Sequence, residues 1–270
     1  MRDSTASHNT AFPGVAGGIL LALALGPAAL GQPADLDASR LALSVDDHRP
    51  LSALADQLEK RYQVTITYEE GPWVAAADVE DYTQAIIQAN GPGKAAPAVP
   101  ILGPRKAAVS FEYALSPAKG RPTDYADLLS ALLFQYDAAG APGQFRFEGD
   151  RGIYHLIPAR LVDADGQWSE VQPVLSTPVR LADEERSVDD TLDEIVAQLN
   201  EASPVKVGWG YVPLNLFVQT RIRLAADGVP AREVMRQILE LLPRRATWRL
   251  NYDPTTKKYY LSFLLLPGGR

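Results

Sequence analysis

The chain has 270 residues, 46% hydrophobic and 22% charged, and its 33 acidic and 26 basic residues give a formal net charge of -7. These values are typical of a folded soluble protein, and they exclude a chain that is disordered throughout. The absence of cysteine excludes disulfides, thiolate metal sites and a cysteine nucleophile. Three histidines leave little scope for imidazole chemistry.

The first segment of interest is an uncharged apolar run over residues 14–30, which is followed by Gln32 and Pro33. Ala29 and Gly31 are small residues at the spacing of a signal-peptidase site, so residues 1–31 are predicted to be a signal peptide. The alternative is an uncleaved anchor, although the run is at the short limit for spanning a bilayer. After cleavage we expect a periplasmic or secreted protein with no stable membrane span.

The rest of the chain contains two copies of one order of elements. The first copy is predicted to have a strand with Leu41, Leu43 and Val45, a helix from Pro50 to about Leu58, strands at 64–68 and 109–113, a helix over 125–133, and a hairpin with arms at 145–147 and 153–157. Pro50 suits the first position of a helix.

The second copy repeats this order. It is predicted to have a strand with Val179 and Leu181, a helix over 188–199 capped by Ser187, strands at 205–209 and 218–224, a helix that begins at Pro230 and ends at Pro243, and a hairpin with arms at 248–252 and 259–265. The first copy is 34 residues longer, and the extra residues lie at about 70–104. This insertion is rich in Gly and Pro, so a tolerated loop is the simpler interpretation and a functional excursion the alternative.

The fold class predicted from these elements is α+β, with two tandem βαββαββ domains whose helices pack on one face of short mixed or antiparallel sheets. The first domain covers residues 40–158 and the second 178–266. Residues 159–177, which include Asp163-Ala164-Asp165-Gly166, are predicted to be the linker between them.

The helix that starts Arg49-Pro50-Leu51 and runs to Leu58, and the later Gly228-Val229-Pro230 helix start, resemble the short N-terminal domain shared by secretins and TonB-dependent receptors. The resemblance covers most of residues 41–158 and 178–266 and rests on element order and helix patterning. It implies a periplasmic interaction module without catalytic residues. No gate-forming domain or outer-membrane barrel follows, so the chain itself is neither pore nor receptor.

Several clusters were considered as candidate chemistry. Asp46-Asp47-His48 places an imidazole beside carboxylates, and with His155 it could form a metal or acid–base site, but an acidic helix start explains it more simply. The acidic runs at 183–185 and 189–190 could be paired carboxylates of a hydrolase, yet their place at a helix start favours a solvated face. We therefore expect no enzyme, no catalytic or metal-binding residue and no cofactor.

Charge is unevenly distributed along the chain. Residues 203–270 carry a net charge of +7 and residues 32–202 a net charge of -14. In the last domain the residues that alternate with the expected core would give a basic sheet face if their strands share one sheet. The candidate binding residues on that face are Arg221, Arg223, Arg249, Lys258 and Tyr260. A plain solvated face is the alternative.

These observations predict a non-enzymatic, exported interaction module of the cell envelope, accessory to secretion or TonB-type transport. Its partner would be an unidentified envelope protein, bound by the basic face or by a free strand edge. Head-to-tail contact between the acidic first copy and the basic second copy of another molecule is a further expectation, and no nucleic acid is expected. The alternative function is binding of an anionic envelope glycan or lipid head group by the same face, aided by Trp209 and Tyr211.

Overall fold

The computed structural model describes residues 39–90, 99–116, 120–150 and 152–268, so the predicted signal peptide lies outside the described residues. Contacts group Asp37–Arg270 into one compact unit. Its described elements mix helices with strands in several sheets, which confirms the predicted α+β class. No described helix combines the length and apolar character needed to span a membrane.

The first copy begins with an antiparallel two-stranded sheet and ends in a hairpin. Its shared elements are β1 (Arg40–Asp47), α1 (Pro50–Tyr62), β2 (Thr65–Glu69), β5 (Ala107–Ala114), α3 (Tyr125–Ala138), β6 (Gln144–Asp150) and β7 (Ile153–Val162). β1 pairs with β5, β2 lies parallel to β7, and β6 is antiparallel to β7. The helix α1 contacts both β1 and β2, and α3 contacts both β5 and β6, so the helices lie between the two sheets.

The second copy has the same pairing. Its elements are β9 (Pro178–Ser187), α4 (Val188–Ala202), β10 (Val207–Trp209), α5 (Leu214–Gln219), β11 (Arg221–Pro230), α6 (Ala231–Leu241), β12 (Ala246–Asp253) and β13 (Lys258–Leu265). β9 pairs with β11, β10 lies parallel to β13, and β12 is antiparallel to β13. Each of these strand pairs has a counterpart in the first copy, whereas α5 has none.

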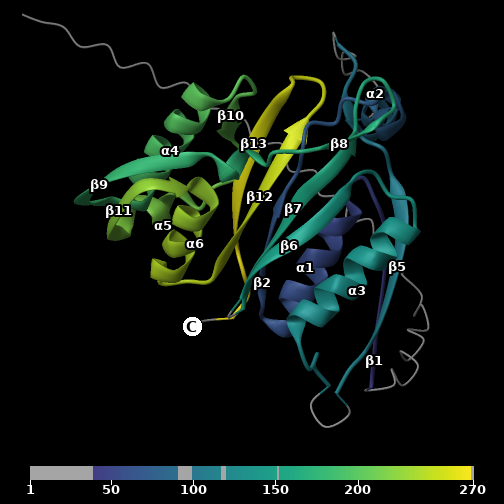
Figure 1. Cartoon of the computed structure of the whole chain (residues 1–270), viewed down its shortest axis with the longest axis horizontal. Helices are drawn as coiled ribbons and strands as arrows, with labels where there is room; N and C mark the ends of the chain where they lie inside the picture. The colour runs from purple at the N-terminus through teal and green to yellow at the C-terminus, as the bar shows by residue number, and fades with distance from the viewer. Residues whose placement is uncertain (1–38, 91–98, 117–119, 151, 269–270) are drawn as a thin grey trace, which may run out of the picture. The chain divides into compact units, whose positions relative to one another are not determined.

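The two copies share one sheet. β12 lies beside β2 in parallel, with Arg249 opposite Tyr68 and Leu250 opposite Glu69, which gives the strand order β10-β13-β12-β2-β7-β6. Figure 1 shows α1 and α3 beside the first-copy strands and α4, α5 and α6 beside the second-copy strands, with the shared sheet between. The pairing of β12 with β2 therefore joins the strands of both copies into one sheet.

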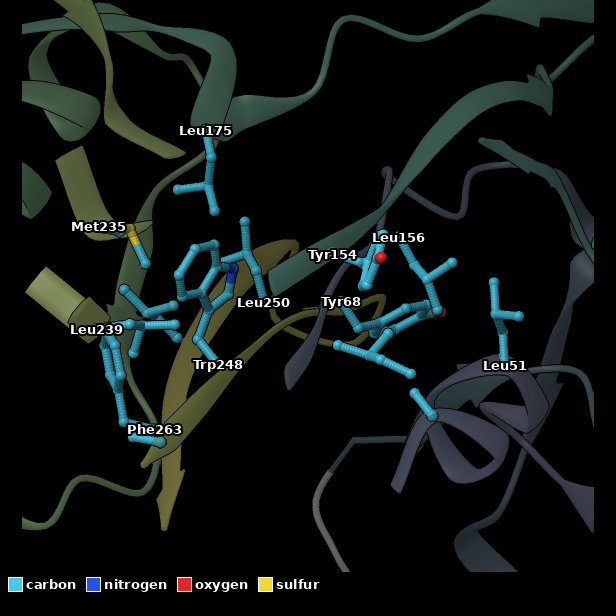
Figure 2. Close-up of a cluster of buried hydrophobic side chains, with 14 of the residues drawn as sticks. Leu51, Tyr68, Tyr154, Leu156, Leu175, Met235, Leu239, Trp248, Leu250 and Phe263 are labelled. Atoms are coloured by element: carbon cyan, nitrogen blue, oxygen red, sulfur yellow. The ribbon is translucent and has the colours of Figure 1, made fainter. Parts of the chain in front are cut away.

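The helices of the two copies pack on opposite faces of the shared sheet. Figure 2 shows Trp248 pointing toward Met235 of α6, whereas Tyr68 points the other way, toward Leu51 of α1. Residues that are opposite in register share a face of a sheet, so Arg249 lies on the α1 face with Tyr68, and Glu69 lies on the α6 face with Leu250. Each copy thus covers sheet surface that the other copy leaves open.

Two segments differ from the expectation. Val218, expected in a strand, belongs to α5, and the strand begins at Arg221 instead. The helix buries Phe217 completely, so packing overrides the β-branched residues around it. The expected linker at 159–177 contains the end of β7, the short strand β8 (Trp168–Glu170), which pairs back on β7, and the turn η2 (Val174–Ser176), in which Leu175 is fully buried.

The insertion carries structure of its own. Its elements are the turn η1 (Ala76–Asp78), β3 (Val79–Asp81), α2 (Thr83–Asn90) and β4 (Leu102–Pro104), and its residues 91–98 lie outside the described residues. β3 pairs with β4, and the Leu102 N–H donates to Thr255 Oγ1 (2.6 Å) in the β12–β13 turn. The insertion of the first copy is thereby attached to the second copy.

Candidate functional site

The structure does not gather the five candidate binding residues on one face. Arg221 and Arg223 lie on β11, which belongs to the two-stranded sheet with β9, whereas Arg249 lies on β12 and Lys258 and Tyr260 lie on β13 of the shared sheet. The expected basic sheet face required all three strands to share a sheet. Arg223 is also neutralised locally, because its guanidinium pairs with both oxygens of Asp183 (2.8 and 3.2 Å).

Arg249 is inside the protein, with 3% of its surface exposed. Its guanidinium donates to Glu59 Oε2 (2.6 Å) and to Asp56, both on α1, and to the Ile66 carbonyl oxygen (2.7 Å). Burial raises the pKa of the Glu59 carboxyl, and the Arg249 guanidinium opposes that rise. The residue expected to bind a partner instead binds the first copy of its own chain.

A reciprocal ion pair lies on the opposite face of the sheet. Arg232 of α6, in the second copy, donates to Glu69 Oε2 of β2 (2.6 Å), and the two side chains are 9% and 1% exposed. The other Glu69 oxygen accepts from the Leu175 N–H (2.9 Å). Both oxygens of this buried carboxylate are therefore bonded, which is the condition for a charge to remain inside a protein.

A third buried carboxylate completes the junction. Glu70 follows β2, accepts from Arg49 Nε (2.9 Å) and from the Tyr252 N–H of β12 (2.7 Å), and its own N–H donates to the Leu250 carbonyl (2.9 Å). A second guanidinium nitrogen of Arg49 donates to the Tyr252 carbonyl (3.0 Å). Arg232 and Arg249 of the second copy thus pair with carboxylates of the first copy in the same chain. The expectation was a charge-driven contact between different molecules.

The remaining titratable clusters are held by structural partners. Asp46 pairs with Lys106 (2.6 Å), His48 Nδ1 bonds to the Tyr82 hydroxyl (2.8 Å), and Asp190 accepts from the Ser187 hydroxyl (2.6 Å). Within the described ranges, no three His, Cys, Asp or Glu side chains gather as metal ligands. Asp189 and Asp190 lie in the first turn of α4, as expected, whereas Asp183, Glu184 and Glu185 lie on the strand β9 and not at a helix start.

A polar cleft of about 420 Å³ lies between the β6–β7 hairpin and the first turn of α6. His155 on its floor bonds through Nδ1 to Thr67 Oγ1 (2.7 Å) and stacks on Trp248 at 5.2 Å. Burial, followed by the nearby Arg232 and Arg236, lowers the pKa of His155 to about 3. His155 is therefore neutral near pH 7, so it can be buried against Trp248 between the two copies without an uncompensated charge.

An apolar cleft of about 520 Å³ lies where the insertion meets the β12–β13 turn. Its apolar wall is supplied by Trp73, Val74, Val79, Leu102, Tyr252 and Pro254. Val74 is 52% exposed, an unusual value for a valine in a concave wall, whereas Trp73 is 4% exposed and anchors the segment. Glu80, Asp81 and Lys257 are the charged residues of the lining.

Sequence reasoning missed this cleft because its walls come from segments about 175 residues apart in the chain. A local signal is Pro72-Trp73-Val74, one of several short apolar runs in the insertion. Periodicity assigns no face to such a short run, so only its packing against the second copy shows which side chains remain exposed.

Comparison with known proteins adds no relative. No protein-family model matches the chain, and neither the curated proteins nor the solved structures yield a match.

Proposed function

We propose that the chain is a non-enzymatic, exported binding protein of the cell envelope, and that its apolar cleft holds an apolar segment of a partner protein. The observation that carries the proposal is the cleft of about 520 Å³ with Val74 half exposed in its wall. Exposed apolar surface in a concave site is the usual mark of a binding site. The resemblance to secretin and TonB short N-terminal domains, which are interaction modules, supports the same proposal.

Two further observations support a binding role over an enzymatic one. The buried carboxylates Glu59, Glu69 and Glu70 are each held by an arginine and a backbone N–H, so their charge stabilises the fold. The apolar run at residues 14–30 supports export. Accessory action in secretion or TonB-type transport is the process we propose for this module.

The test is site-specific photo-crosslinking at Val74 in cells that produce the chain. We expect a benzoylphenylalanine at position 74 to capture one discrete protein, and a peptide from its crosslinked segment to bind the purified chain. Val74→Asp should weaken binding of that peptide by about tenfold or more, because a charge would enter an apolar contact.

Val218→Asp is the matched control, because Val218 is 48% exposed on α5, outside the cleft. Equal crosslinking at positions 74 and 218, or peptide binding that survives Val74→Asp, would contradict the proposed site. The alternative function, binding of an anionic glycan or lipid head group, predicts salt-sensitive binding that is indifferent to Val74. Because Arg249 is buried and Arg223 is paired, no observation favours that alternative.

A further inference from the structure

We infer that the chain associates head to tail with further copies of itself, with the outer edge of β6 in one molecule lying beside the outer edge of β10 in the next. This inference is independent of the proposed function, because it uses other surfaces and another partner. It rests on the way in which the two internal copies already join.

The internal junction joins two three-stranded units side by side and leaves a free strand edge at each end of the sheet. β12 of the second copy lies parallel to β2 of the first. The strands β10, β13 and β12 follow one another across the sheet in the same order as their counterparts β2, β7 and β6. β12 is antiparallel to β13 but parallel to β2, which is itself parallel to β7, so β13 runs in the opposite direction to its counterpart β7. The copies are thus related by a shift across the sheet and a half-turn. In such a heterologous relation the two strands that meet inside have their counterparts at the two ends of the sheet.

Those two edges have no strand beside them among the described residues. β6 is the counterpart of β12 and pairs only with β7, and β10 is the counterpart of β2 and pairs only with β13. β8 does not cover β6, because Arg160 of β7 faces Gln144 of β6 on one side and Glu170 of β8 on the other. A sheet edge of this kind is a template for a further strand.

At these edges Phe147 of β6 and Trp209 of β10 direct their backbone groups outward, whereas the Tyr211 N–H already donates to Ser262 Oγ (3.1 Å) and the Tyr211 carbonyl accepts from the Phe263 N–H (2.7 Å). The Thr65 N–H donates to the Gly152 carbonyl, so every second residue of β7 from Gly152 to Leu156 directs its backbone N–H and carbonyl toward β2. Phe147 of β6 lies opposite Leu156, and it therefore directs its own N–H and carbonyl away from β7. The Gly210 N–H donates to the Leu261 carbonyl, so Trp209 directs its backbone groups away from β13. Repetition of the internal register would place Arg146 opposite Trp209 and Phe147 opposite Gly210 of the next molecule.

The charge pair of the junction also has a counterpart at the ends. In the junction Arg249 of β12 bonds to Asp56 of α1, and the equivalent positions are Arg146 of β6 and Asp193 of α4. The Arg146 side chain is 47% exposed and Asp193 is exposed. Asp193 also accepts from Trp209 Nε1 of β10 (2.9 Å), so charges of opposite sign lie at the two edges that would meet.

The other junction contacts are not repeated. Val196 stands at the position equivalent to Glu59, and Gly210 at that of Glu69, so the contact between molecules lacks the buried ion pairs. Asn200 additionally bonds to the N–H and carbonyl of Val207 (2.7 and 2.9 Å), which shortens the available edge of β10. The association is consequently weaker than the internal junction and depends on concentration.

The test is sedimentation velocity of the whole purified chain from about 1 to 500 μM, where weak protein contacts populate. We expect the sedimentation coefficient to rise with concentration beyond that of a dimer. Arg146→Glu and Asp193→Arg should each weaken association by about tenfold, and the double variant Arg146→Glu/Asp193→Arg should restore it.

Arg40→Glu is the matched control, because Arg40 on β1 is, like Arg146, an exposed arginine on a strand that pairs with an exposed glutamate. Three results would overturn the inference: a monomer at every concentration, association that stops at a dimer, or charge reversals that the double variant does not rescue. Circular dichroism of each variant separates lost association from lost folding.

Discussion

At the residue scale, Arg249 is the side chain whose removal should cost most. Arg249→Met leaves the 1%-exposed Glu59 carboxylate without its counter-charge, and breaking a buried pair in this way costs about 3–5 kcal/mol. We expect the urea midpoint to fall accordingly. Arg223→Met, which removes an exposed pair with Asp183, is the control and should change it little. Equal midpoints for the two variants would show that the junction pair does not contribute as argued.

His155 should make the protein less stable as the pH falls. Its pKa is about 3 in the folded protein against 6.5 for the ordinary group, because burial and the charges of Arg232 and Arg236 disfavour the imidazolium. The unfolded chain therefore takes up the proton first, and folding should lose about 2 kcal/mol between pH 7 and pH 5 from this group.

The measurement for His155 is the free energy of unfolding of the wild type and of His155→Gln at pH 7, 6 and 5. The difference between the two proteins isolates the histidine from the buried carboxylates, whose pKa values are raised by burial and which act in the opposite sense. Parallel pH profiles would mean that His155 titrates normally in the folded state.

At the element scale, most local signals in the sequence had the expected outcome. Pro50 begins α1, and the Ser187 hydroxyl accepts from the Asp190 N–H (3.0 Å) at the start of α4, because both residues satisfy helix-start requirements within one turn. α5 was missed because its six residues include Phe217 and Val218, which are typical of strands. Its helical form depends on burying Phe217 against Phe263 at 5.1 Å, a contact that no local pattern contains.

At the scale of the whole molecule, the shared sheet predicts that the two copies unfold together. The junction contains two residue pairs between β2 and β12 and the buried ion pairs Arg249–Glu59 and Arg232–Glu69, so neither copy retains its covered sheet face alone. We expect one urea transition, with hydrogen exchange showing α1 and α4 losing protection at the same concentration. Arg232→Met/Arg249→Met should separate the transitions, whereas two transitions in the wild type would contradict this view.

The sequence by itself determined the element order, the internal repeat and the α+β class, because alternation, helical spacing and helix-start residues act over a few neighbouring positions. It also showed that residues 203–270 carry a net positive charge and residues 32–202 a net negative charge. Only the tertiary structure decided where that charge goes: whether Arg249 faces solvent or Glu59 depends on which strand edge β12 joins, about 180 residues away in the chain. Strand alternation specifies two faces but does not specify what covers them, and for that reason Arg249 of the predicted basic face lies in the internal junction.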